Sequence, residues 1–207
     1  VNAGDCESIM LLGRAYENGW GVDKDCKKAG ELFEKARQLG SKTAEECLKQ
    51  MEPETQYRLG LKFMEGRGVA QNYTLARSWF SRAAEQEDVG SMAWLGHLLA
   101  NGLGGDVDIK AAVELFEKAA KHNSAVALME IGGLYRAGQF YKEDKEKALE
   151  YYRKAASFWN DTPEECRWLA VGGFNRMALM YKKGEACAKD ELLAARLYRF
   201  AATSGKN

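Results

Sequence analysis

The apolar and polar positions of this chain follow a pattern that recurs several times, and each period holds two short amphipathic segments. In residues 91–102, "SMAWLGHLLANG", and in residues 110–122, "KAAVELFEKAAKH", apolar residues recur every three or four positions. This spacing predicts helices with one apolar face. A glycine closes the first segment, and a short polar loop leads to the second. Each period therefore predicts a helical hairpin.

Five copies of the hairpin align on one small residue of the first segment, at Gly13, Gly60, Gly96, Gly132 and Ala178. An aromatic residue or leucine follows three positions after each anchor, a glycine six, an alanine sixteen, an aromatic twenty and an alanine twenty-three. We expect the anchor to let a neighbouring helix approach closely, and the glycine to end the first helix. One hairpin cannot bury its apolar stripe alone. The period therefore predicts an all-α solenoid of five stacked helix-turn-helix repeats.

The anchors are unevenly spaced, which indicates two insertions. Gly60, Gly96 and Gly132 follow one another at 36 residues, whereas the first and last intervals are 47 and 46. Insertions of 11 and 10 residues thus follow the first and fourth repeats. We predict a single solenoid domain over residues 1–207, with repeats at about 5–40, 53–88, 89–124, 125–160 and 170–205 and insertions at about 41–52 and 160–170.

Both insertions carry helix signals. The first, "SKTAEECLKQM", has helical spacing and stops before Pro53. The second holds Thr162 as an N-cap followed by Pro163, which predicts an overlong first helix in the last repeat, with Gly172-Gly173 as its weak point. An insertion in a repeat array either carries binding or only spaces the repeats, and the sequence leaves both open.

Composition and charge exclude several classes of protein. Hydrophobic residues make up 46% of the 207 residues, which is typical of a globular protein, and 30 basic residues balance 30 acidic ones. A chain without net charge lacks the basic surface of a nucleic-acid binder. No apolar run is long enough to span a membrane, so we expect no membrane insertion in this segment. The chain begins with Val1 rather than methionine, so a signal peptide, if one was removed, is not visible.

The cysteines leave the compartment open. There are five, an odd number, and none forms a CxxC motif, so a zinc site of the usual spacing is not expected. Free thiols in a reducing compartment are the simpler interpretation and favour a cytoplasmic location. The alternative is a periplasmic or secretory-lumen protein, in which Cys26 would pair with Cys47 and Cys166 with Cys187.

Few residues are suited to catalysis. Histidine carries protons near neutral pH, and only His97 and His122 are present. His122 follows the second helix of the third repeat, where an exposed polar residue is expected. His97 follows an anchor glycine and would face the inner surface of the solenoid. We predict no catalytic residues, no metal and no cofactor. The alternative is a small-ligand-binding protein or hydrolase that uses His97 and a nearby thiol.

The repeated motif resembles a known family. The pattern LG-x-x-Y-x-x-G-x-G-V, followed by A-x-x-x-[FY/W]-x-x-A-A at a 36-residue period, is similar to the Sel-one-like repeat, a relative of the tetratricopeptide repeat. The resemblance implies a right-handed α/α superhelix that acts as an adaptor and gathers partner proteins. The last repeat, "MALMYKKGEACAKDE", lacks the anchor glycine, and the fourth has Phe140 and Tyr141 where Gly-Val is expected. The eight-residue cysteine spacing of a disulfide-bridged branch of the family is absent, so its bridges and its ligand are not expected here.

The surface for a partner follows from the same resemblance. In related repeats the first helix of each hairpin lines the concave groove, and the positions three before, one after and four after each anchor should face it. The predicted partner-binding residues are Met10, Arg14, Glu17, Tyr57, Leu61, Met64, His97, Met129, Arg136, Asn175 and Lys182. Apolar, adaptable side chains with a charged rim are typical of a groove for a protein or peptide. The alternative is that tight curvature buries the apolar members between repeats.

Other apolar residues support packing or association rather than chemistry. Trp79 and Trp94 are expected between helices, whereas Trp20 replaces a loop residue and is expected at the surface, where an exposed aromatic is a candidate contact. The apolar stripe of the fifth repeat has no polar capping helix after it. Self-association, or further repeats at the ends, is therefore a third hypothesis.

Overall fold

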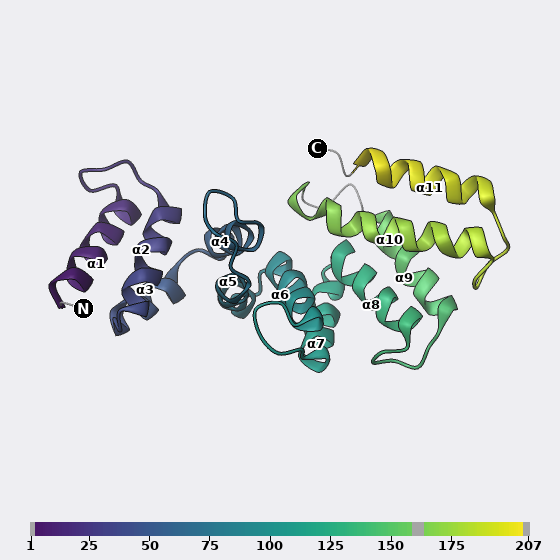
Figure 1. Cartoon of the computed structure of the whole chain (residues 1–207), viewed down its shortest axis with the longest axis horizontal. Coiled ribbons are helices and arrows are strands. Elements are labelled where there is room, and N and C mark those ends of the chain that lie inside the picture. Colours follow the sequence, from purple (N-terminus) through teal and green to yellow (C-terminus); the bar gives the residue numbers. More distant parts are fainter. Residues whose placement is uncertain (1–2, 159–163, 205–207) are drawn as a thin grey trace. The chain divides into compact units, whose positions relative to one another are not determined.

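The computed structural model describes residues 3–158 and 164–204, with side chains for 6–158 and 171–203. These residues form eleven α-helices and no strand, as the hydrophobic pattern predicts. The first helices of the five hairpins are α1 (Ala3–Asn18), α4 (Pro53–Glu65), α6 (Val89–Asn101), α8 (Ala125–Ala137) and α10 (Glu164–Lys183). The second helices are α2 (Cys26–Gln38), α5 (Tyr73–Glu85), α7 (Ile109–Lys121), α9 (Lys145–Ser157) and α11 (Glu191–Ser204), and α3 (Lys42–Gln50) is an additional helix after the first hairpin (Figure 1).

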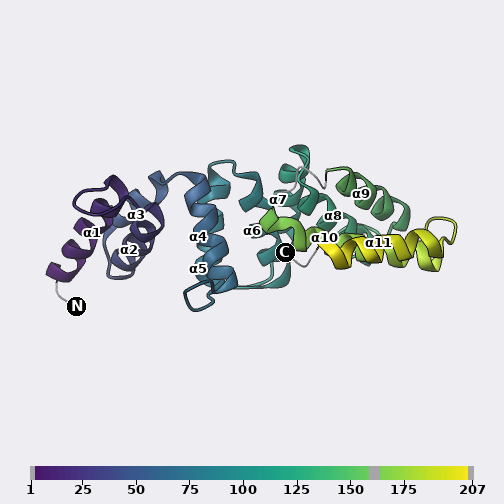
Figure 2. The ribbon, with the colours of Figure 1, turned by 90° about the horizontal axis from the view of Figure 1, so that it is seen from above.

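The chain divides into two compact units. The first contains the residues up to Ser91 together with Leu103–Gly105, and the second contains Met92–Gly102 and the residues from Asp106 onward. Within the first unit, α1 packs beside α2 and α4 beside α5. Within the second, α8 packs beside α9 and α10 beside α11, and the same pairs can be followed in both views of the ribbon (Figures 1 and 2).

The anchor glycine makes room for the aromatic ring of the second helix in its own hairpin. A β-carbon at Gly60 would lie 2.5 Å from the ring of Phe80, and the three equivalent pairs show the same overlap. These are Gly13–Phe33 at 2.6 Å, Gly96–Phe116 at 2.6 Å and Gly132–Tyr152 at 2.7 Å. The anchor therefore admits a neighbouring helix, as expected, and that neighbour is the second helix of the same hairpin.

The fifth hairpin departs from this arrangement at both positions. Its anchor is Ala178, which is buried, and its aromatic residue, Tyr198, is 37% exposed. The corresponding rings of Phe33, Phe80 and Phe116 have no exposure. The alanine methyl group and the less deeply inserted ring thus occur together in the one repeat that lacks the glycine.

The loop between the two helices of a hairpin has the same hydrogen bonds throughout. Gly66 and Gly138 end α4 and α8 in the left-handed conformation, as predicted. The residue that caps the second helix donates its backbone N–H to the carbonyl oxygen of the residue three positions after the anchor. These bonds are Asp25 to Tyr16 (2.9 Å), Asn72 to Phe63 (2.8 Å), Asp108 to Leu99 (3.0 Å), Asp144 to Tyr135 (3.0 Å) and Asp190 to Tyr181 (3.0 Å). The side chains of these cap residues accept amides of the first turn, for example Lys28 N–H to Asp25 at 3.0 Å.

The first insertion forms a helix that belongs to the core of the first unit. Ala44 and Leu48 of α3 are fully buried. The Gln56 amide, also without exposure, donates to the Leu48 carbonyl oxygen at 2.7 Å and accepts from Gln86 at 2.9 Å. This insertion is therefore more than a flexible spacer, because its removal would expose apolar side chains and leave a buried amide without partners.

A buried ionic network joins α3 to two helices of the repeats. The Arg82 guanidinium on α5 lies 3.7 Å from a Glu34 oxygen on α2 and 3.3 Å from a Glu45 oxygen on α3. Arg37 lies 2.6 Å from Glu34. The Glu34 side chain is only 4% exposed, so its charge depends on these arginines for compensation.

The second insertion is only partly described. Residues 159–163, including the predicted N-cap Thr162 and Pro163, lie outside the described residues. From Glu164 onward, α10 runs for 20 residues, which confirms an overlong first helix. Gly172-Gly173 does not interrupt it. A β-carbon at Gly173 would overlap the side chain of Met129 on α8, so this glycine permits close packing of α8 and α10.

Cysteines and tryptophans resolve some of the alternatives. Cys6, Cys26, Cys47 and Cys187 are free thiols, so Cys26 and Cys47 do not form a bridge, and the side chain of Cys166 lies outside the described part.

The buried positions of Trp79 and Trp94 are confirmed, as is the exposure of Trp20, at 65%. Among the described helices, each is too short or too polar to cross a lipid bilayer.

Candidate functional site

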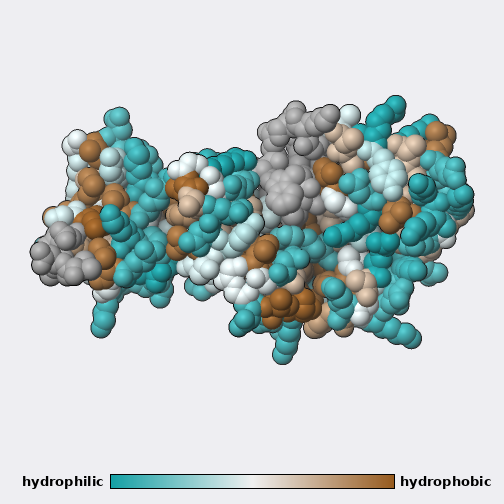
Figure 3. All heavy atoms as spheres, in the orientation of Figure 1, coloured by the Kyte–Doolittle hydropathy of each residue, from teal (hydrophilic) through white to brown (hydrophobic). Residues whose placement is uncertain are grey.

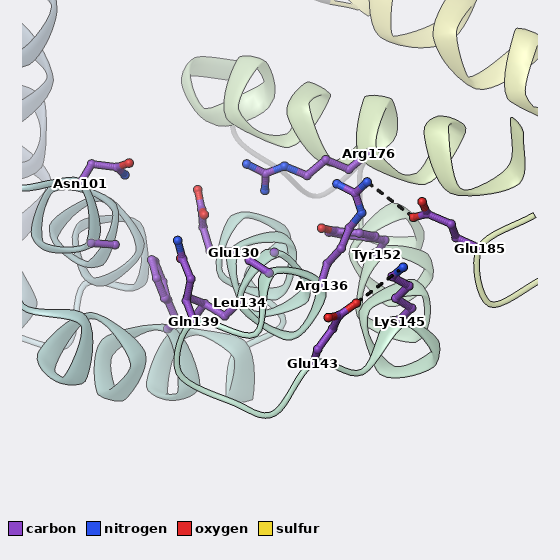
Figure 4. A pocket seen from close by; sticks show the side chains of 14 residues that line it. Asn101, Glu130, Leu134, Arg136, Gln139, Glu143, Lys145, Tyr152, Arg176 and Glu185 are labelled. Atoms are coloured by element: carbon purple, nitrogen blue, oxygen red, sulfur yellow. Dashed lines mark ion pairs between the residues drawn. The ribbon is translucent and has the colours of Figure 1, made fainter. Parts of the chain in front are cut away.

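A polar pocket of about 560 Å³ lies in the second unit, where three consecutive first helices meet. Helices α6, α8 and α10 contribute side chains, and the loop from α8 to α9 closes one side (Figure 4). The residues with polar groups that line it are Asn101, Glu130, Arg136, Gln139, Glu143, Lys145, Tyr152, Arg176 and Glu185. A concave site of this volume with convergent polar groups is the usual form of a ligand or peptide site.

The pocket face of the first helices agrees with the predicted groove face at two of its three repeat positions, because Gly133 and Arg136, one and four positions after the anchor, line the pocket. The difference lies before the anchor. Glu130 on α8 and Arg176 on α10 each stand two positions before their anchor, and both line the pocket. Gly133 and Ala137 follow Glu130 at three and seven positions, which places them on the same helix face. Met129, three positions before the anchor, instead packs against Gly173.

Each carboxylate of the pocket lies close to a basic side chain. Glu185 Oε2 lies 3.6 Å from Arg136 Nη2, and Glu143 Oε1 lies 3.5 Å from Lys145 Nζ (Figure 4). Glu130 Oε1 lies 3.0 Å from the Nδ1 atom of His97, on α6. Each carboxylate of the pocket thus has a nitrogen of the protein nearby, while the buried Glu185 Oε2 atom makes no hydrogen bond.

Arg176 differs from the other basic residues of the pocket. No carboxylate among the described residues lies within 4.0 Å of its guanidinium. The side chain extends over Gly133, where a β-carbon would lie 3.0 Å from Nη1 of Arg176. Figure 4 shows Arg136 and Arg176 approaching the pocket from α8 and α10. Arg176 is thus the one basic side chain among the described lining residues that has no carboxylate within 4.0 Å.

Tyr152 forms the floor of the pocket beneath these arginines. Its side chain has no exposure, and its hydroxyl lies beside Arg176 without a hydrogen bond of good geometry to that or any other described group. Burial raises the pKa of Tyr152, while the charges of Arg176 and Arg136 act in the opposite direction. The hydroxyl therefore stays protonated at neutral pH and is available as a donor.

The predicted groove residues divide into buried and accessible sets. The apolar members are all buried, with at most 9% exposure: Met10, Tyr57, Leu61, Met64 and Met129. This differs from the expected apolar patch. Tyr57 illustrates the cause, because its ring lies 6.0 Å from that of Phe80 and against Gly90. The polar members stay accessible or half-buried: Arg14, Glu17, His97, Arg136, Asn175 and Lys182. Of these six, only Arg136 lines the pocket, and His97 adjoins it through Glu130.

The first unit has a depression of its own, of about 530 Å³, next to α1. Met10 and Arg14 line it, together with Leu11 and Cys6. Hydrophobic atoms gather over α1 in the space-filling view (Figure 3), and Leu11 and Leu12 are among the exposed apolar residues. The structure thus brings Met10 and Arg14, two of the predicted residues, together beside α1.

The unusual loop of the fourth repeat builds an aromatic cluster outside the pocket. Tyr141 stacks on Tyr135 with ring centroids 4.3 Å apart, and its hydroxyl donates to Glu117 at 2.6 Å. Burial, reinforced by the Glu117 bond, raises the pKa of Tyr141 well above its usual range. Phe140 packs edge-on against Tyr141. The residues that replace Gly-Val therefore stabilise the loop by packing.

The pocket offers charged and hydrogen-bonding groups to a ligand. Among the described residues, no group of three or more His, Cys, Asp or Glu side chains is placed to hold a metal ion. The His97 ring is oriented by Glu130 and lies near the Asn101 amide, 3.5 Å away. Four further residues belong to the site although the repeat pattern did not indicate them: Glu130, Gln139, Tyr152 and Arg176. Glu130 and Arg176 were detectable as charged residues at one shared repeat position.

Comparison with known proteins identifies the repeat. The Sel1 repeat model matches five times, at residues 6–41, 53–88, 89–124, 125–157 and 175–206. The chain belongs to the Sel1 repeat family. These five Sel1 repeats coincide closely with the five hairpins deduced from the anchor spacing, and the segments between them hold the two insertions.

Solved Sel1 repeat structures share the fold. The Sel1 repeat protein from Oxalobacter formigenes is similar over 97% of this chain and 74% of its own, with a TM-score of 0.61 and 27% identity. A protective antigen of uropathogenic Escherichia coli that displays an SLR fold is similar over 98% of this chain and 39% of its own, with a TM-score of 0.58 and 26% identity.

Two curated relatives are much longer than the region they share with this chain. Protein sel-1 homolog 2 of Rattus norvegicus is 31% identical over 96 residues, which is 46% of this chain and 14% of the relative. Chitin synthase regulatory factor 3 of Schizosaccharomyces pombe is 26% identical over 159 residues, 73% of this chain and 16% of the relative. The chain thus spans only 14% and 16% of the length of these two curated relatives.

Proposed function

We propose that this Sel1 repeat chain is a non-enzymatic scaffold that binds another protein through the pocket face of its second unit. The observation that carries the proposal is that three successive repeats contribute first-helix side chains to one polar pocket of about 560 Å³. A site built from several repeats is suited to an extended segment of a partner, because each repeat contributes contacts at a regular interval.

The residues of this face favour a polar, hydrogen-bonded contact. Asn101 and Gln139 provide amide donors and acceptors at the rim, and Arg136 and Glu130 add charge. Protein-binding sites commonly combine buried apolar anchors with such polar groups. In the first unit, Arg14 and the apolar side chains beside α1 form a second candidate contact surface. The remaining members of the predicted groove, Glu17, Asn175 and Lys182, would lie outside the central contact of the pocket.

The family context supports a role without chemistry of its own. One relative bears the name chitin synthase regulatory factor 3. A scaffold needs only a stable surface. The buried contacts between the anchor glycines and the aromatic rings hold each hairpin together and so keep that surface in place. The alternative is a small-ligand-binding or hydrolytic role that uses His97, whose ring is held by Glu130. This alternative predicts that His97→Ala abolishes a measurable activity or ligand affinity.

A pocket-filling variant tests the proposal. Asn101→Trp combined with Gln139→Trp places two bulky side chains at exposed positions that line the pocket. The control, Lys110→Trp combined with Glu114→Trp, alters two exposed positions of α7 that do not line it. In quantitative affinity capture from the native host, the proteins retained by the wild type should be lost with the pocket variant and kept with the control. Equal retention by all three proteins would overturn the assignment of this face.

A further inference from the structure

The geometry points to a carboxylate group as the ligand of the pocket, carried by an acidic side chain or by the C-terminus of a partner polypeptide and paired with Arg176. This inference rests on the proposed function, because it names the chemistry that the same face recognises. It assigns to Arg176 the role of principal contact.

The pairing of the charged side chains in the pocket is the first observation behind the inference. Glu185 and Glu143 each lie within 4 Å of a cationic side chain of the protein, and Glu130 lies 3.0 Å from the His97 ring. Arg176 lies near no carboxylate of the described residues within that distance. A guanidinium pairs most strongly with a planar oxyanion, through two parallel hydrogen bonds. An incoming carboxylate would therefore give Arg176 the close partner that the other basic side chains of the pocket already have, whereas an incoming cation would have to displace an existing partner.

The space around Arg176 is the second observation that favours a bound carboxylate. Gly133 leaves the guanidinium room on the α8 side, since a β-carbon there would lie 3.0 Å from Nη1. The first repeat has Arg14 and the third has His97 at the position that Gly133 occupies in the fourth. Only in this repeat does a glycine follow the anchor, so the recess beneath Arg176 is specific to this pocket among the five repeats.

Unfilled donors in the same recess provide an independent observation. The Tyr152 hydroxyl is fully buried at the floor of the pocket and has no hydrogen-bond partner of good geometry among the described groups. The Nε atom of Arg136 and the Oε2 atom of Glu185, which lies 3.6 Å from Nη2 of the same arginine, are likewise buried without a hydrogen bond. Buried donors without partners are uncommon because each costs free energy, and they are expected where a ligand supplies the acceptor. The Tyr152 hydroxyl, a donor without an acceptor beside the Arg176 guanidinium, matches the acceptor-only chemistry of a carboxylate.

Nuclear magnetic resonance titration with short capped peptides provides the test. The probes are acetyl-Gly-Asp-Gly-amide, which offers a side-chain carboxylate, and acetyl-Gly-Gly-Gly with a free C-terminal carboxylate. The controls are acetyl-Gly-Asn-Gly-amide and acetyl-Gly-Lys-Gly-amide. We expect at least one carboxylate probe to shift the Gly133 amide and Arg176 Nε signals in a saturable way. The relative affinities of the two probes distinguish a side chain from a chain terminus as the source.

Two variants and one control complete the design. Arg176→Gln should raise the Kd of the carboxylate probe at least about tenfold, because it removes a charge-assisted pair. Gly133→Ala should also weaken binding, because its methyl group displaces the guanidinium without removing the charge. Arg196→Gln, at an exposed position of α11 that does not line the pocket, should leave the Kd within about twofold of the wild type.

The possible outcomes separate this inference from the proposed function. Equal shifts by the Asp, Asn and Lys peptides would support a peptide site on this face but overturn carboxylate recognition. Saturable binding that survives Arg176→Gln would overturn the role of Arg176. The absence of saturable shifts with any peptide would overturn the inference as well, while the capture experiment would still decide the proposed function on its own.

Discussion

The ring of Phe80 fills the space that a β-carbon on Gly60 would need, with 2.5 Å between the two positions. The same overlap between anchor glycine and aromatic ring is present in four of the five hairpins. In the fifth, Ala178 takes the place of the glycine and Tyr198 is partly exposed. This pairing explains why a glycine and an aromatic residue recur twenty positions apart, and it ties each first helix to its second helix.

Replacing the anchor glycine should destabilise the protein. Gly60→Ala favours the helix by about 1 kcal/mol but forces the buried ring of Phe80 aside, and overpacking of that kind costs about 3 kcal/mol. We expect a net loss of about 2 kcal/mol in urea unfolding followed by circular dichroism. Gly172→Ala in α10 is the matched control, because nothing lies within 4 Å of its β-carbon, and it should not destabilise. Equal stability of Gly60→Ala and the wild type would contradict the claim that close packing of the Phe80 ring requires a glycine at the anchor.

The N-cap residue of α2, Asp25, should make the free energy of unfolding depend on pH. The Asp25 carboxylate accepts the backbone N–H of Lys28 and of Lys27, and these bonds lower the pKa of Asp25. A lowered folded-state pKa means that the stabilisation is present above about pH 4, the unfolded value, and is lost as pH falls through the folded one. Asp25→Ala should lose about 1 kcal/mol at pH 7.

The comparison with Asp25→Asn isolates the ionisation. The asparagine oxygen still accepts the amide bonds but does not titrate. The stability difference between the wild type and Asp25→Asn, measured by thermal unfolding, should therefore shift in favour of the variant between pH 6 and pH 3. A difference that is constant across this interval would show that the charge of Asp25 does not contribute.

Breaking the ionic network around Arg82 should lower the free energy of unfolding, whereas replacing both charged partners with leucine should lower it much less. Arg82→Leu leaves the Glu34 carboxylate, which is 4% exposed, without a close cation from α5, and we expect a loss of about 3 kcal/mol. The double variant Arg82→Leu with Glu34→Leu should recover most of that loss in the same urea experiment. Lys189→Ala, which breaks the exposed pair with Glu191, should leave the midpoint unchanged. Destabilisation of the double variant beyond the single one would contradict the account.

The hairpins could be predicted from the sequence because their determinants are local and repeated. The apolar stripe, the glycine at the end of the first helix and the anchor position each recur in several copies, so single exceptions do not obscure them. The cap residues from Asp25 to Asp190 also share one repeat position, twelve residues after the anchor, and could have been recognised as helix starts. The extra helix α3 was detectable from its spacing and from Pro53.

The pocket could not be predicted in the same way, because it depends on how the helices rotate when they pack. A shift of one residue along a helix turns a side chain by about 100°, so the choice between Met129 and Glu130 decides whether the groove is apolar or polar. Met129 turns toward Gly173, a contact between residues far apart in the sequence. The free Arg176 likewise becomes evident only when the partners of every neighbouring carboxylate are known.

The most direct measurement of the central claim is site-specific photocrosslinking in the native host. A photoreactive amino acid at Gln139, on the rim of the pocket, should form a covalent adduct with a partner protein, and the same group at the exposed position of Glu114 on α7 should not. Adducts at Gln139 that disappear when Arg176 is replaced by glutamine would agree with both the scaffold role and the carboxylate ligand. Adducts that form at Glu114 and not at Gln139 would contradict the claim that this pocket face binds the partner.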